Sequence, residues 1–279
     1  QVCSLSIQLS PMATLLGAAD PVPLSYRLLD GQDTLPPVVF LHGLFSNKNI
    51  FQAEAEALAQ QTGRKVLTVD ARNHGESPHS PDCSYEATSA DLQALLSKLG
   101  LSPCVLIGHS MGGKTAMALA LQKPELVERL VSVDVSPLVA TDIPKIFEII
   151  PVMKAINILG DVSNSEAFEV VDEYLKLFVK DSSIRQYLFN SLVRVNGQDV
   201  WKVNAENLWQ QQNLLLGSFR SRESIMAPHS SSEAPIHPSS HKNKLLFPED
   251  QFQTIPDASH ILHIQKPHEF MNSILSFLS

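Results

Sequence analysis

Short apolar runs alternate with segments of helical periodicity along the first half of the chain. Continuous apolar runs predict buried strands, whereas apolar positions three and four apart predict helices that cover them. The predicted strands are Val22–Leu28, Val38–His42, Lys65–Asp70, Pro103–Gly108 and Leu130–Val135. The predicted helices are Phe51–Thr62, Ser89–Leu99 and Lys114–Gln122. This order predicts a mostly parallel, twisted sheet with right-handed crossovers and helices on both faces.

The pattern changes after Pro137, where Thr141–Leu216 is mostly helical with a turn at Asn196-Gly197. A helical block at this place predicts a lid, residues 138–217, inserted into an α/β core formed by residues 21–137 and 218–279. Within the block, Ile143–Leu159 is rich in Ile, Phe, Met and Val. This stretch is either a packed pair of helices or an apolar wall for an acyl chain.

The segment Ser218–Asn243 is rich in Ser, His and Pro, and it predicts a loop rather than a strand. Regular structure is predicted again at Gln251–Ile255, a strand, and at His268–Leu278, a helix. Residues 1–20 are predicted to lie outside the core, as the remnant of a targeting region. The chain starts with Gln1 rather than Met, so its start is expected to be processed or truncated, with further targeting sequence upstream, and the sequence leaves the compartment open.

Composition narrows the classes of function. The chain has 279 residues and a formal net charge of −8, which argues against binding nucleic acid through its phosphates. No apolar run reaches the roughly 18 residues of a membrane span. The spacing of Cys3, Cys83 and Cys104 fits neither a disulfide framework nor a zinc site. Neither a metal nor a cofactor is predicted.

The clearest chemical motif is Gly108-His109-Ser110-Met111-Gly112-Gly113, which matches G-x-S-x-G. It ends a predicted strand and opens a predicted helix, the strand–turn–helix setting of a nucleophile elbow. In such a turn Ser110 is the nucleophile, and the backbone N–H of Met111 faces the developing oxyanion. The loop His42-Gly43-Leu44-Phe45 follows another strand, so the N–H of Leu44 is predicted as the second oxyanion donor. We expect His42 to hold this loop rather than to react.

His260 is the predicted general base, because it follows a predicted strand near the end of the chain. His263 is its nearest rival, and we expect it at the surface. The acid is less clear. Asp134, at the end of a strand and 24 residues after Ser110, is favoured over Glu233, and Glu206 in the predicted lid is a further alternative. A structural role for Asp134, as a cap of the following segment, stays open.

The loop Asp70-Ala71-Arg72-Asn73-His74-Gly75 follows a predicted strand as well. We interpret it as a turn that shapes the site, with a local ion pair between Arg72 and Asp70.

Together these motifs resemble the α/β-hydrolase superfamily, and within it the family of α/β-hydrolase domain-containing protein 11 with its small bacterial esterase relatives. The resemblance implies a serine hydrolase of esters or acylglycerols in mitochondria, and a link to the 2-oxoglutarate dehydrogenase complex. In some members the acid comes from the end of strand six, which supports Asp134. Two positions depart from the family: Ser224–Ser232 is polar where an apolar seventh strand is typical, and Ser259 replaces a Gly.

The motifs and the resemblance together predict a serine hydrolase that cleaves carboxylic esters, of acylglycerols or other acyl lipids, through an acyl-enzyme on Ser110. Two alternatives stay open. A protein with the fold but no working site would act by binding a partner, and the altered seventh strand is the reason to consider it. The other alternative is a thioesterase or an acyltransferase on the same fold.

Overall fold

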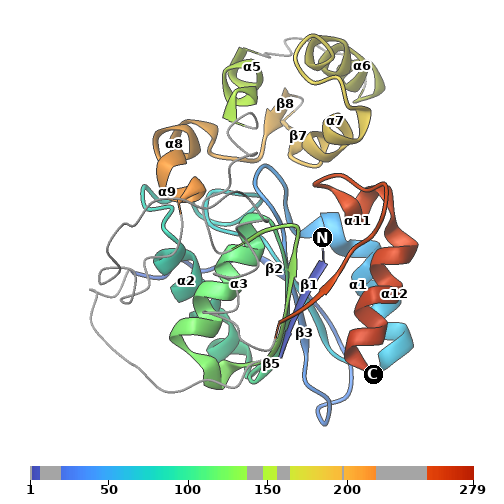
Figure 1. The fold of residues 1–279 in the computed structure, drawn as a ribbon. Helices are drawn as coiled ribbons and strands as arrows, with labels where there is room; N and C mark the ends of the chain where they lie inside the picture. Colours follow the sequence, from blue (N-terminus) through green and yellow to red (C-terminus); the bar gives the residue numbers. More distant parts are fainter. Residues whose placement is uncertain (1, 7–19, 137–146, 156–163, 197, 218–249) are drawn as a thin grey trace, which may run out of the picture.

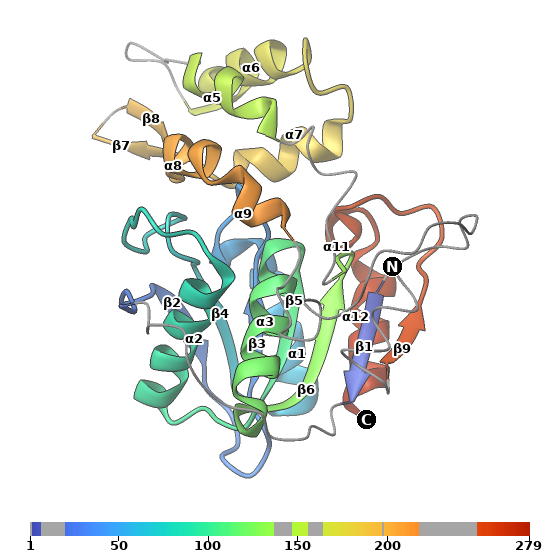
Figure 2. The ribbon, with the colours of Figure 1, turned by 60° about the vertical axis from the view of Figure 1, so that its left-hand side comes forward.

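The computed structural model describes residues 2–6, 20–136, 147–155, 164–196, 198–217 and 250–279. Its main sheet has seven strands in the order β2-β4-β3-β5-β6-β1-β9 (Figures 1 and 2). They are β1 (Val2–Ser6), β2 (Tyr26–Leu29), β3 (Val38–Leu41), β4 (Val66–Val69), β5 (Cys104–His109), β6 (Val127–Val133) and β9 (Asp250–Gln253). Strands β4, β3, β5 and β6 are parallel, whereas β2 runs antiparallel to β4.

Helices cover both faces of the sheet, and these are α1 (Gln52–Thr62), α2 (Tyr85–Leu99), α3 (Met111–Gln122) and α12 (Pro267–Leu278). In Figure 1, α2 and α3 lie on one side of the sheet and α1 and α12 on the other. Alternate residues of β3 enter two different cores, because successive side chains of a strand point to opposite faces. Val39 packs with Leu92 and Met117, and Phe40 packs with Phe51 and Phe270. The predicted α/β fold with helices on both faces is confirmed.

A helical insertion lies above the carboxyl ends of the parallel strands (Figures 1 and 2). We use this name for residues 147–217 as far as they are described. Its elements are α5 (Ile149–Ala155), α6 (Asn164–Leu175), α7 (Ser182–Phe189), the hairpin β7 (Leu192–Val195) and β8 (Gln198–Trp201), α8 (Ala205–Gln210) and α9 (Gln212–Leu216). Val195 of β7 pairs with Gln198 of β8, and Gly197 of the predicted turn lies outside the described residues. Phe147 and Ile150 pack in one cluster with Leu44 and Met111, so this part of the apolar stretch faces the predicted site.

Strand β1 takes the place between β6 and β9 and runs antiparallel to both. Val2 is paired with Val133 on one side and with Gln253 on the other. The expectation that residues 1–20 lie outside the core is wrong for Val2–Ser6, because their backbone pairs with β6 on one side and β9 on the other. The predicted loop Ser218–Asn243 lies outside the described residues. In the described sheet, β1 therefore joins the strands after which Asp134 and His260 follow.

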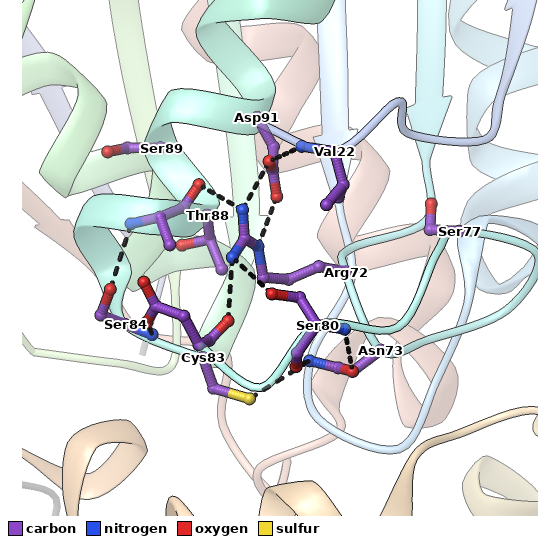
Figure 3. A network of polar contacts seen from close by, with 12 residues as sticks. Val22, Arg72, Asn73, Ser77, Ser80, Cys83, Ser84, Thr88, Ser89 and Asp91 are labelled. Atoms are coloured by element: carbon purple, nitrogen blue, oxygen red, sulfur yellow. Dashed lines mark hydrogen bonds and ion pairs between the residues drawn. The ribbon is translucent and has the colours of Figure 1, made fainter. Parts of the chain in front are cut away.

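The loop between β4 and α2 is held by a buried ion pair, and the expected partner of Arg72 was wrong. Its guanidinium donates to both carboxylate oxygens of Asp91 on α2, at 2.6 and 2.7 Å, rather than to Asp70 (Figure 3). It also donates to the carbonyl of Asp82, at 2.9 Å. Asp70 instead accepts from the ammonium of Lys48, at 2.7 Å. One side chain thus ties the loop to a helix of the core.

This loop in turn contacts the helical insertion. The amide of Gly75 donates to the carbonyl of Lys202, at 2.7 Å. The amide of Asn204 donates to the carbonyl of Asn73, at 2.8 Å. Arg72 therefore fixes a loop on which part of the insertion rests.

We expect the substitution Asp91→Ala to lower the free energy of unfolding by about 3–5 kcal/mol, because it leaves the buried Arg72 charge without its carboxylate. Urea denaturation of the two proteins measures this difference. The matched control is Glu56→Ala, which removes the exposed ion pair with Arg27 and is expected to cost about 1 kcal/mol or less. Equal costs of the two substitutions would contradict the assigned role of Arg72.

We expect Ser4→Pro to destabilise the protein by about 1–3 kcal/mol, because proline cannot donate to the ladder and leaves a neighbouring carbonyl without its hydrogen bond. Ser4 lies mid-strand, opposite Val131 and Gln251. Ser4→Ala keeps the N–H and is expected to be neutral in the same urea titration. If Ser4→Pro were also neutral, β1 would not be an inner strand.

Candidate active site

Ser110 lies on a sharp turn between β5 and α3. Its backbone φ is +51°, a left-handed value that is strained for a residue with a side chain. Glycines make the turn possible: a Cβ on Gly112 would lie 2.3 Å from the carbonyl oxygen of Leu41, and one on Gly108 would lie 2.4 Å from that of Gly112. Larger residues at either position would push the helix away from the sheet.

The structure brings Ser110, His260 and Asp134 together in the order that nucleophilic catalysis requires. Nε2 of His260 lies 3.0 Å from Oγ of Ser110, and Nδ1 lies 2.7 Å from Oδ2 of Asp134. With the proton on Nδ1, that nitrogen donates to the carboxylate and leaves Nε2 free to accept the hydroxyl proton. The three residues follow β5, β9 and β6, respectively, so one edge of the sheet presents all of them.

Asp134 is kept ionised by its surroundings. Burial by itself would raise the pKa of its carboxyl, but the hydrogen bond and charge of His260 outweigh burial and hold the pKa below its usual value. A carboxylate that stays charged can orient the imidazole and stabilise the imidazolium that forms when His260 takes a proton.

The other predicted acids lie elsewhere. Glu206 is on α8, and its carboxylate bonds the ammonium of Lys154 and the amide of Gln210. Glu233 lies outside the described residues. Asp134 is thus the carboxylate that the described structure places against His260.

Met111 and Leu44, the predicted oxyanion donors, are both buried beside the elbow. Met111 is the first residue of α3, where a backbone N–H has no acceptor within the helix and the helix dipole favours negative charge. Leu44 lies in the loop after β3, and its carbonyl accepts the hydroxyl of Tyr187 at 2.8 Å. Tyr187 thereby ties the loop to α7 of the insertion.

Two neutral histidines hold the loop that contains Leu44. Nδ1 of His42 donates to the carbonyl of Gly43, at 2.8 Å, and its Nε2 accepts from the amide of Ala71, at 3.0 Å. Nε2 of His74 accepts from the amide of Phe45, at 3.3 Å. Burial lowers the pKa of both rings, to about 3 for His74, so each can accept through Nε2 at neutral pH. The structural role predicted for His42 agrees with these contacts.

His109 was not among the site residues predicted from the sequence. Its Nε2 donates to the backbone carbonyl of His260, at 2.8 Å, so the residue before the nucleophile supports the loop of the predicted base. Burial holds the pKa of His109 well below its usual value, which keeps the ring neutral. Its position in the motif, directly before Ser110, is the signal that could have pointed to it.

His263 is buried, with 1% of its surface exposed, so the expectation of a surface position was wrong. Its ring packs between His109, at 4.5 Å between centroids, and Phe51, at 5.0 Å. Burial lowers its pKa to about 3. The physical reason is that α11 (Leu262–Gln265) carries His263 into the core, where Phe51 and Phe270 pack against its ring.

The described residues contain no group of three or more His, Cys, Asp and Glu side chains that could hold a metal ion. Within the same residues, no helix is long and apolar enough to cross a membrane.

Comparison with known proteins identifies the family of the chain. A family profile described as "alpha/beta hydrolase fold" matches residues 36–267. The chain belongs to this family. It is also 50% identical over 264 residues to the mouse (Mus musculus) protein named sn-1-specific diacylglycerol lipase ABHD11, covering 93% of this chain and 86% of the relative.

More distant relatives are bacterial esterases. Esterase YbfF of Escherichia coli is 28% identical over 249 residues, which cover 87% of this chain and 93% of the relative. A solved structure described as a marine microorganism esterase superposes with a TM-score of 0.76 at 27% identity, covering 92% of this chain and 99% of that one. The relatives thus combine lipases and esterases on one fold, and the chain is a homologue of this carboxylic ester hydrolase group.

We expect Asp134→Asn to lower kcat by up to about 10⁴-fold, because the amide favours the wrong imidazole tautomer. Steady-state hydrolysis of a soluble ester measures this effect. Glu206→Gln is the control. Its kcat should stay within about twofold of the wild type, because the Glu206 carboxylate pairs with Lys154 and not with His260. A fully active Asp134→Asn protein together with an inactive Glu233→Gln protein would show that the acid had been assigned to the wrong residue.

Proposed function

We propose that this chain hydrolyses carboxylic esters of acylglycerols, with diacylglycerol as the leading candidate, through an acyl-enzyme on Ser110. The observation that carries the proposal is the position of His260, whose two ring nitrogens reach Ser110 Oγ and Asp134 Oδ2 at the same time. Such an arrangement raises the nucleophilicity of a hydroxyl without a metal or cofactor.

In the first half of the reaction, His260 takes the proton of Ser110 while Oγ attacks the ester carbonyl. The new C–O bond turns the carbonyl oxygen into an oxyanion, which the amides of Met111 and Leu44 stabilise. The imidazolium then gives the proton to the leaving alcohol as the ester bond breaks. In the second half, His260 activates a water molecule, which attacks the acyl-enzyme and releases the acid.

Two observations support an acyl-lipid substrate. The predicted oxyanion residues Met111 and Leu44 belong to an apolar cluster that extends into the insertion through Phe147, Ile150 and Met153. We call these three side chains and the cluster around them the apolar roof, because they lie on the insertion side of the site, where an acyl chain can pack against them. The mouse relative is named a diacylglycerol lipase, and it is 50% identical to this chain over the 264 aligned residues.

The family resemblance also leads us to propose a mitochondrial location and a link to the 2-oxoglutarate dehydrogenase complex. Fractionation of cells that express the full-length protein tests the location. Co-purification of the complex with a tagged copy, compared with a tagged unrelated hydrolase, tests the link.

We expect a fluorophosphonate probe to label the wild-type protein and not Ser110→Ala, because only a serine activated by a base reacts at a useful rate. Gel fluorescence measures the labelling, and circular dichroism verifies that both proteins are folded. A folded wild-type protein that stays unlabelled would contradict the hydrolase proposal and favour a binding protein with the same fold.

The substrate is tested by release of fatty acid from diacylglycerols that carry different chains at sn-1 and sn-2. We expect the wild-type protein to release fatty acid and the Ser110→Ala protein to release none. A parallel assay with acyl thioesters, and with added alcohol acceptors, separates hydrolysis of oxygen esters from thioester cleavage and acyl transfer. If Ser110 were labelled but only acyl transfer were seen, the reaction class would be wrong although the nucleophile was right.

A further inference from the structure

Lys114 is a buried lysine that the proposed chemistry does not use. It lies in the first turn of α3, and the residue is 2% exposed. Among the described residues no carboxylate forms an ion pair with it. Burying an ammonium without a counter-ion is costly, and burial lowers its pKa to about 8. At neutral pH the side chain therefore still carries its charge, and polar groups must take the place of water around it.

The partners of Lys114 are backbone carbonyls at the end of the helical insertion. Nζ donates to the carbonyl of Gly217 at 2.7 Å and lies 3.4 Å from that of Leu216. These groups close helix α9, where carbonyl oxygens have no intrahelical donor and the helix dipole favours a cation.

Tyr85, the first residue of α2, completes the contact from a second helix of the core. Its hydroxyl donates to the carbonyl of Leu215 at 2.8 Å, and the Lys114 ammonium lies 5.5 Å from the centre of its ring. Burial raises the pKa of Tyr85, so its hydroxyl keeps the proton that it donates. Two core side chains thus bind three consecutive carbonyls of the insertion, and we call this arrangement the α9 clasp.

The α9 clasp is close to the proposed reaction centre on both sides. On the core side, the backbone N–H of Lys114 donates to the carbonyl of Ser110 at 3.0 Å. On the insertion side, Leu215 is buried in the same apolar cluster as Met111 and Phe147. In Figure 2, α9 stands directly above α3. A shift of α9 would therefore loosen the apolar roof without moving the hydroxyl of Ser110.

We propose that Lys114 and Tyr85 are positioning residues that fix α9 over the nucleophile elbow and thereby set the affinity for long acyl chains. This inference rests on the proposed ester hydrolysis. Short acyl groups contact few side chains of the apolar roof, so loss of the α9 clasp should change the KM of short esters little. Long chains depend on the whole roof, so release of α9 should weaken their binding while the chemical step is kept.

The test uses Lys114→Met, which keeps an unbranched apolar chain but removes the donor, and Tyr85→Phe, which removes only the hydroxyl. For a long-chain ester we expect KM to rise about tenfold in each variant, the factor for about 1.4 kcal/mol of lost positioning. For p-nitrophenyl acetate, kcat and KM should both stay within about twofold. Lys98→Met and Tyr174→Phe, at exposed positions, are the controls and should change neither substrate.

A double variant adds a second criterion. Because either substitution alone should release the same helix end, the combined rise in KM should be smaller than the product of the single effects. Equal losses for short and long esters, or a long-chain KM that does not change, would overturn the proposal.

Hydrogen exchange provides a readout that does not depend on activity. In Lys114→Met and Tyr85→Phe, amides of α8 and α9 should exchange faster, while those of β3, β5 and α3 keep their protection. If protection is lost throughout the core of Lys114→Met, Tyr85→Phe decides, because it keeps the aromatic packing. Unchanged exchange in α9 would overturn the α9 clasp itself, whereas a wild-type protein inactive on every ester would overturn the proposed function instead.

Discussion

The close approach of α3 to the end of β3 is the constraint on which the rest of the site depends. Because Gly112 has no side chain, the first turn of the helix can lie against the carbonyl of Leu41. That contact brings the loop with Leu44 beside Ser110 and Met111, so both predicted oxyanion donors belong to backbone that is already fixed. The apolar cores on the two faces of the sheet outweigh the strained conformation of Ser110.

Around this contact, neutral imidazoles act as rigid connectors between loops. His42 and His74 join the loop after β3 to the loop after β4, and His109 joins the elbow to the loop of His260. Each of these rings donates through one nitrogen, in the case of His74 from Nδ1 to the carbonyl of Arg72 at 3.0 Å. His42 and His74 also accept through the other nitrogen, which an imidazolium cannot do. Burial therefore contributes to the support of these loops, because it lowers the pKa of the three rings and keeps them uncharged at neutral pH.

Much of this arrangement could be predicted from the sequence, because its signals are local. Apolar runs marked the parallel strands, and the glycines around Ser110 marked the elbow. Asp134 and His260 could be placed because each follows a strand, and the structure brings them together. The start of α2 at Tyr85 was missed by four residues, although Ser84 caps the helix by accepting from the amide of Ala87.

Other features could not be predicted, because they depend on contacts between distant segments. The residues around Arg72 in the sequence do not indicate that it pairs with Asp91 rather than with Asp70. The burial of His263 likewise depends on Phe51 and Phe270, which pack against its ring from distant parts of the chain. The place of β1 was missed for a similar reason. Five residues of mixed polarity, Val2–Ser6, give no clear period, and their partners lie near residues 130 and 250.

The position of β1 has a consequence for the order in which the protein assembles. Strands β2 to β6 and their helices can pair as soon as the first half of the chain is made, and this already forms the elbow. The antiparallel β1 must wait for β6, and His260 arrives only with the last segment, after β9. Closing such long loops is slow, so these contacts are expected late in folding. In a nascent chain, Ser110 would already lie on its turn but would have no imidazole beside it. Its reactivity would begin only when β9 pairs with β1 and brings His260 to it.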